Sequence, residues 1–135
     1  MTVQLSTAVR NARLDAIETA IGTSAVLKIR TGAQPADCDA ADSGTVLASI
    51  TLPSDWSNAA SGGSKTKAGT WQDASADNSG TAAHYRLYAS DGTTCHEQGS
   101  VTVTGGGGDL TLDSVSITAG QVVTISTWTK TDGNA

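Results

Sequence analysis

The spacing of apolar residues changes along the chain from a helical period to an alternating one. Leu14, Ile17 and Ile21 recur at intervals of three and four residues, which places them on one face of a helix. A serine and a threonine before this segment can cap its start, and a glycine can end it. The pattern predicts one helix over residues 6–22.

After this helix, apolar and polar residues alternate, which is the period of a β-strand with one buried face. Leu27 and Ile29 face one way in the first such segment, and its lysine and arginine face the other. Clusters of glycine, proline, serine and aspartate separate the segments. Strands are expected at residues 25–31, 45–52, 68–72, 81–89, 95–104, 110–112, 116–117 and 121–130, with a weaker one near Trp56 in an otherwise long loop at 54–69.

Short strands at regular turn spacing after one N-terminal helix are typical of an antiparallel β-sandwich or barrel. We expect a mainly β fold, with a jelly roll as the preferred arrangement and an immunoglobulin-like sandwich as the alternative. The length of 135 residues suits one domain. This domain is expected over 6–130, with the sandwich at 25–130, an N-terminal arm at 1–5 and a polar tail at 131–135.

The material for the core is unusual, because the chain has no Phe and its aromatic bulk comes from three Trp and two Tyr. Trp71 and Trp128 lie in predicted strands and are expected in the core. Trp56 lies near a loop, so we expect it at the surface. A core this thin in apolar bulk often gains stability from binding partners.

The charge pattern excludes some classes of partner. The net charge is −5, only 16% of residues are charged, and the eight basic residues are scattered along the chain. Binding to nucleic acid requires clustered Lys and Arg, so we expect no nucleic-acid partner. No segment has the length and apolarity of a membrane span, and the start lacks a signal-peptide pattern. We therefore expect no membrane partner, and synthesis and folding in a cytosol.

The nucleophiles and bases of the chain do not form a catalytic pattern. Cys38 and Cys95 lack a motif spacing, and their pairing cannot be inferred from sequence alone; free thiols are the default in a reducing compartment. His96 follows Cys95, but neighbours in a strand point to opposite faces, so the two are not expected to act as base and nucleophile. His84 is expected at an exposed strand position beside Arg86.

Two other segments resemble binding motifs only superficially. Residues 37–42 hold three aspartates around Cys38, but their spacing is not that of a calcium loop, and we interpret them as a solvated turn. Residues 105–108 are four glycines without the following Lys-Ser/Thr and helix of a phosphate loop, so a flexible strand connection is expected. We expect no catalytic residue, no metal site and no cofactor.

Several segments together resemble a family of small tailed-bacteriophage virion proteins. The resemblance extends over nearly the whole chain and is carried by structural rather than reactive residues. The matching segments are residues 5–16, 27–35, 44–48, 82–92, 109–114 and 117–123.

This resemblance implies a non-enzymatic structural component of the virion, of the head decoration or cement type. Such proteins look like β-sandwiches or jelly rolls that bridge neighbouring capsomers and reinforce the shell. The implied partners are the major capsid protein and further copies of this chain, as a dimer or trimer. The implied location is the capsid surface of the virion, after synthesis in the host cytoplasm.

Three residues are our candidates for partner contact: Val3, Leu5 and Trp56. The arm that holds Val3 and Leu5 could extend onto a capsid subunit or add a strand to a partner sheet. Alternatively, Leu5 packs on its own helix as a hydrophobic staple. A tail, collar or fibre component that binds host carbohydrate through Trp56 is the alternative function, and an enzyme that uses Cys95 is a weaker third.

Overall fold

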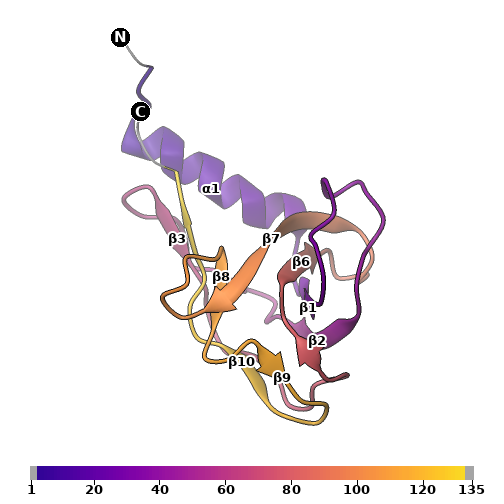
Figure 1. Cartoon of the computed structure of the whole chain (residues 1–135). Helices are drawn as coiled ribbons and strands as arrows, with labels where there is room; N and C mark the ends of the chain where they lie inside the picture. Colours follow the sequence, from indigo (N-terminus) through magenta and orange to yellow (C-terminus); the bar gives the residue numbers. More distant parts are fainter. Residues whose placement is uncertain (1–2, 133–135) are drawn as a thin grey trace.

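The computed structural model describes residues 3–132, and in this range one α-helix precedes a series of short strands (Figure 1). The fold is mainly β, as predicted. The elements are α1 (Thr7–Ile21), β1 (Val26–Arg30), β2 (Val46–Thr51), β3 (Ser64–Thr66), β4 (Trp71–Asp73), β5 (Gly80–Thr81), β6 (His84–Tyr88), β7 (Cys95–Val103), β8 (Leu110–Leu112), β9 (Ser116–Ile117), β10 (Val123–Ile125) and β11 (Thr129–Thr131).

The helix begins and ends with the caps that the sequence predicts. The Ser6 side chain accepts a hydrogen bond from the backbone N–H of Val9, which satisfies one of the unpaired donors of the first turn. Gly22 follows the last turn with φ +91°, a conformation that favours glycine. Leu14 and Ile21 are buried, so the apolar stripe packs against the rest of the chain.

Five strands form the main sheet, in the order β2-β1-β6-β7-β8. All pairs in it are antiparallel except β7–β8, which is parallel. Leu27 lies opposite Leu87 and Ile29 opposite Tyr85 in the β1–β6 register, and all four side chains are fully buried. This face of the sheet forms one wall of the hydrophobic core.

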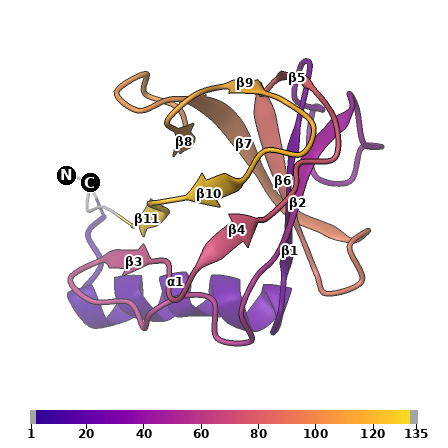
Figure 2. The ribbon, with the colours of Figure 1, turned by 90° about the horizontal axis from the view of Figure 1, so that it is seen from below.

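Three two-stranded ladders, β4–β10, β3–β11 and β5–β9, complete the described part of the fold. The main sheet curls, with β4 against β2 and β10 against β8 (Figure 2). At the contact between β2 and β4, the backbone N–H of Ser49 donates to the carboxylate of Asp73. The β4–β10 ladder therefore lies between the two edges of the curled sheet and encloses the core from that side.

The three tryptophans form one cluster at the centre of this core. Trp56, Trp71 and Trp128 have ring centroids 5.5–6.1 Å apart, in tilted or edge-on arrangements that aromatic pairs prefer. The burial of Trp71 and Trp128 is as predicted. The expectation that Trp56 lies at the surface is wrong: its side chain is 0% exposed, and its indole N–H donates to the carbonyl of Gly22.

The structure also changes the expected pattern between residues 54 and 69 and at the tail. Part of the expected loop is strand β3, whose Lys65 is buried and forms an ion pair with Asp15 of the helix at 2.8 Å. An isolated Ser-Lys-Thr segment carries no apolar signal, so the pattern missed this strand. Thr131, expected in the polar tail, belongs to β11, while 133–135 lie outside the described residues.

The four-glycine segment connects β7 to β8, and steric constraints explain its composition. Parallel neighbours usually need a crossover of about a dozen residues or more, but residues 104–109 are enough here. Gly105 and Gly107 have φ +87° and +82°. A Cβ on Gly108 would lie 2.8 Å from the Thr102 hydroxyl, which accepts the Gly108 N–H. The expected strand connection is confirmed, and close backbone approach requires its glycines.

We predict that Trp71→Ala lowers the free energy of unfolding by about 3–5 kcal/mol, because it leaves a cavity between the other two indoles. Trp71→Phe should cost about 1–2 kcal/mol, since it keeps an aromatic ring but loses the indole N–H bond to Ala68. Urea unfolding followed by far-UV circular dichroism measures both. The control is Val122→Ala, at a 55% exposed position, with an expected change under about 0.5 kcal/mol. Equal effects at Trp71 and Val122 would contradict the central role of the cluster.

Candidate functional site

A polar cluster of two buried arginines, a buried tyrosine and a partly exposed aspartate lies on the face of the main sheet opposite the tryptophans. Arg30 of β1 and Arg86 and Tyr88 of β6 project from this face. The segment between β1 and β2 covers them, on the side of the sheet away from β4 and β10 (Figures 1 and 2). Asp42 in this segment accepts hydrogen bonds from Arg86 Nη1 at 2.7 Å, Tyr88 Oη at 2.7 Å and Arg30 Nη2 at 3.0 Å.

Further hydrogen bonds attach the covering segment to the sheet through its backbone. Arg86 Nη2 donates to the carbonyl of Asp37 at 2.8 Å, and Gln98 Nε2 of β7 donates to the carbonyl of Pro35 at 2.8 Å. Gln98 also accepts from Arg86 through its side-chain oxygen. A guanidinium that is only 2% exposed thus has a carboxylate, an amide and a carbonyl as partners. These contacts make the cluster a clamp for the covering segment.

The electrostatics of Asp42 follow from these contacts. Burial disfavours its charged form, but the hydrogen bonds from Tyr88 and Arg86 and the charge of Arg30 outweigh that effect, so the pKa of Asp42 is lowered. Burial and the hydrogen bond to Asp42 raise the pKa of Tyr88 to about 12. At neutral pH the carboxylate is therefore ionised and the phenol neutral. Both are held in charge states that suit a structural contact and not proton transfer.

The expectation for the aspartates at 37–42 is right for one of them and wrong for another. Asp37 Oδ1 accepts the backbone N–H of Ala40 at 2.9 Å, which is the local turn contact expected. Asp42 binds two arginines instead. Both of these arginines are distant in sequence, so the local pattern around Asp42 could not indicate them.

His84 is not at an exposed position, contrary to the sequence prediction. Its side chain is 1% exposed, because the covering segment closes over the sheet face, and its Nδ1 lies 2.9 Å from the carbonyl of Gly32. Burial is the main cause that lowers the pKa of His84, and the charges of Arg30 and Arg86 lower it further. His84 is therefore neutral at physiological pH and is part of the packing beneath the segment.

Cys95 and His96 point to different sides of β7, as the strand alternation predicts. The Cys95 thiol donates to the carbonyl of Glu97 and interacts with the Cys38 thiol. Burial and the Cys38 neighbour raise its pKa to about 12. His96 instead lines a shallow groove beside α1, together with Ala16 and Ile17. A thiol that stays protonated and has no adjacent imidazole is a poor nucleophile.

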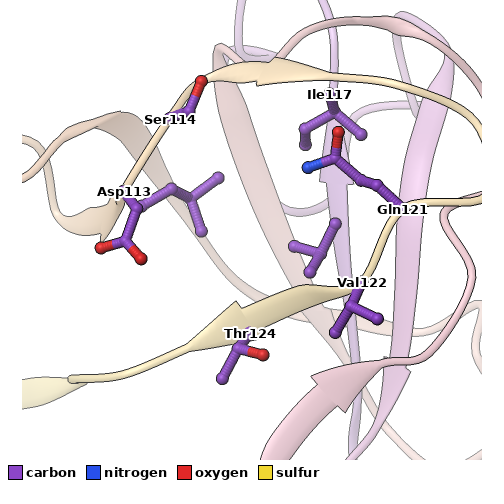
Figure 3. Close-up of a pocket in the computed structure, with 8 residues that line it drawn as sticks. Asp113, Ser114, Ile117, Gln121, Val122 and Thr124 are labelled. Carbon is purple, nitrogen blue, oxygen red and sulfur yellow. The ribbon is translucent and has the colours of Figure 1, made fainter.

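A second shallow groove lies between the β8–β9 connection and β10 (Figure 3). Asp113 and Ser114 lie on one side of it and Gln121 on the other, with Val122 exposed at its rim. Asp113 is the only titratable residue in this lining. One carboxylate without a second acid, a base or a cation does not define a catalytic arrangement. Among residues 3–132, no three His, Cys, Asp or Glu side chains come together as a metal site.

The helix α1 presents an unexpected outer surface. Of the charged residues Arg10, Arg13 and Glu18, only Arg13 is largely exposed. Glu18 accepts hydrogen bonds from the backbone N–H and the hydroxyl of Ser57, and Arg10 donates to the carbonyl of Asp132. The polar side chains of the helix therefore hold neighbouring segments of the chain.

Alanines, in place of charged residues, occupy much of the solvent-facing side of α1. Ala8, Ala12, Ala16 and Ala20 recur every four residues and are all exposed, and Val9 beside them is 45% exposed. We call these five residues the outer face of α1. Their period was visible in the sequence, but which face of the helix turns outward depends on the contacts of its polar side chains.

The arm residues are placed as follows. Val3 is 81% exposed and Leu5 is half-buried beside the start of α1. Val3 is thus available for a contact, while both interpretations of Leu5, partner contact and staple, stay open. Trp56, the third candidate, is inside the core and offers no contact surface.

Comparison of the chain with models of protein families, with curated proteins and with solved structures gives no match. The class of the protein therefore follows from its own structure: a mainly β protein with one N-terminal helix and a buried polar clamp. In the part of the chain that is described, the helix is not long and apolar enough to cross a membrane.

We predict that Asp42→Asn lowers the free energy of unfolding by about 2 kcal/mol, because it leaves two buried guanidinium groups without their carboxylate. Hydrogen exchange in residues 33–43 should become faster in this variant. Asp39→Asn is the matched control: it makes the same change in the same segment, at a side chain that does not contact Arg30 or Arg86, with an expected effect under about 0.5 kcal/mol. Indistinguishable variants would show that Asp42 does not hold the segment.

A pH prediction follows from His84. Because its folded pKa lies below that of an unfolded histidine, the unfolded chain binds the proton first as the pH falls. The free energy of unfolding should decline as the pH falls below about 6.5, before most carboxylates begin to titrate. Urea titrations at several pH values measure this decline. His84→Gln should flatten it and His96→Gln, at an exposed position, should not; a decline that is unchanged in His84→Gln would rule out this origin.

Proposed function

We propose that this protein is a non-enzymatic structural component of a tailed-bacteriophage virion, a head decoration protein that binds the outer surface of the major capsid protein lattice and stabilises the shell. The resemblance of six segments to such virion proteins motivates the proposal. The arrangement of charged groups is consistent with it, because Asp42, Arg86 and Lys65 form contacts within the fold.

The observation that carries the proposal is the outer face of α1. A helix on the surface of an isolated protein usually turns its polar residues to water. Here Glu18, Asp15 and Arg10 bind other parts of the same chain, so four alanines and a valine make up much of the solvent side, with Thr19 and Arg13 also exposed there. Small side chains allow a partner backbone to approach closely, so this surface suits a flat contact with a large neighbour.

The proposal includes the β-sandwich or jelly-roll arrangement and self-association. The curled main sheet, with the β4–β10 ladder between its edges, supports a two-layered antiparallel arrangement. Copies of the chain would sit as a dimer or trimer at symmetry-related positions of the capsid surface, after synthesis in the host cytoplasm. Scattered basic residues and a net charge of −5 support a protein partner rather than nucleic acid.

The alternative of a tail, collar or fibre component that binds carbohydrate depended on an exposed tryptophan, which the structure does not contain among residues 3–132. A sugar-stacking platform needs exposed aromatic rings, and Trp56, Trp71 and Trp128 are at most 3% exposed. The weaker hypothesis of an enzyme that uses Cys95 is also not favoured, since that thiol has a raised pKa and lies on the opposite side of β7 from His96.

The proposal is tested by mixing the purified protein with capsids that lack decoration. We expect saturable binding, density at symmetry-related positions of the outer surface in cryo-electron microscopy, and greater resistance of the capsids to heat. A lack of binding to capsid lattices, with binding to tails or fibres instead, would overturn the head assignment.

The contact surface is tested by Ala12→Glu, which places a charge in the outer face of α1 and should weaken capsid binding at least about tenfold. Its matched control is Ala119→Glu, the same change at an exposed position between β9 and β10, which should bind like the parent. Thermal unfolding should be nearly the same for both variants. Capsid binding by Ala12→Glu equal to that of the control would exclude this face as the contact.

A further inference from the structure

We propose that Cys38 and Cys95 are a redox-active pair, and that their oxidation to a disulfide fastens the segment between β1 and β2 to the main sheet. Both thiols are free in the structure. Cys38 lies in the covering segment, and Cys95 is the first residue of β7, so the bond would join two parts of the chain that are distant in sequence.

The first argument is the position of the two residues within the polar clamp. Cys38 directly follows Asp37, whose carbonyl is held by Arg86. Cys95 lies opposite Tyr88 in the β6–β7 register, and the Tyr88 hydroxyl is bound to Asp42 of the covering segment. The clamp thus fixes the backbone on both sides of the pair.

The second argument is that the covering segment lies over the end of β7 that holds Cys95. Gln98 of β7 binds the carbonyl of Pro35 and Arg86 binds that of Asp37, next to Cys38, so the two half-buried cysteines are neighbours, and the Cys38 side chain contributes to the raised pKa of the Cys95 thiol. Clamp contacts at Pro35, Asp37 and Asp42 surround Cys38 in the sequence, so the thiols meet in a held segment and not through chance encounter of a free loop. This arrangement gives the second thiol a high effective concentration toward the first.

The reaction is a thiol–disulfide exchange with a small-molecule disulfide such as oxidised glutathione. One cysteine thiolate attacks the glutathione disulfide, forms a mixed disulfide and releases one glutathione thiol. The other cysteine then attacks the protein sulfur of that mixed disulfide, which forms the Cys38–Cys95 bond and releases the second glutathione thiol. Two protein thiols are oxidised and one glutathione disulfide is reduced, so atoms and electrons balance.

The environment of Cys95 sets the expected rate. Because burial raises its pKa to about 12, little thiolate is present at neutral pH, and exchange should be slow there and faster as the pH rises. The pair should therefore form a structural disulfide slowly and should not act as a rapid catalytic dithiol.

The experiment incubates the whole protein with oxidised glutathione at about pH 8, followed by acid quenching and peptide mapping without reduction. We expect a linked peptide pair that contains Cys38 and Cys95, an intact mass lower by two hydrogens, and a thermal midpoint raised by about 10 °C that reverts with dithiothreitol. Cys38→Ser and Cys95→Ser should each stop at a glutathione adduct and show no such rise.

A second comparison tests the role of the clamp. Asp42→Asn, which releases the covering segment, should lower the equilibrium constant for disulfide formation against glutathione by about tenfold, while Asp39→Asn should leave it unchanged. Three outcomes would overturn the proposal: thiols that stay free, glutathione adducts that persist in the parent, or disulfides between molecules. Disulfide formation that is equal in the Asp42 and Asp39 variants would also overturn it, because the pair would then not depend on the clamp.

Discussion

The mutual contact of three indoles is the interaction on which the rest of this fold depends. In a chain without Phe, Trp56, Trp71 and Trp128 supply most of the aromatic volume of the core, and each belongs to a different segment. Burial of one such ring removes on the order of 200 Å² from water, worth about 5 kcal/mol. Through these rings the helix end, the β4–β10 ladder and the start of β11 share one core, and strands of only three residues become stable.

The two faces of the main sheet bury different kinds of side chain. Its inner face packs aliphatic side chains against the tryptophans, whereas its outer face buries arginines beneath a loop that is rich in small residues. A buried guanidinium needs its full set of acceptors, and the loop supplies them through one carboxylate and its own carbonyl groups. Because the core covers one face of β6 and the loop covers the other, all of β6 is buried, although sequence alternation would expose one side of this strand.

The sequence predicts features that depend on neighbouring residues and misses those that depend on distant ones. The caps of α1, the strands β1, β2 and β6 and the core positions of Trp71 and Trp128 have local signals. The burial of Trp56 and of His84 has no local signal. Trp56 is held in the core by its hydrogen bond to the carbonyl of Gly22, and His84 is covered by the segment that closes over the sheet. Of the candidate contact residues, Val3 is exposed and Trp56 is not. The alanine surface of α1 was missed, since its orientation follows from hydrogen bonds and ion pairs that the polar side chains of the helix make to distant segments.

The attachment of the helix has a consequence for the order of events during synthesis. Arg10 binds the carbonyl of Asp132, a residue 122 positions later in the chain, and Arg13 forms an ion pair with the same aspartate. The helix therefore leaves the ribosome long before this part of its docking surface exists. Contacts to β3 and to Ser57 form earlier in synthesis, but the contacts of Arg10 and Arg13 wait for the C-terminal strand, so a nascent chain would gain its full stability only late.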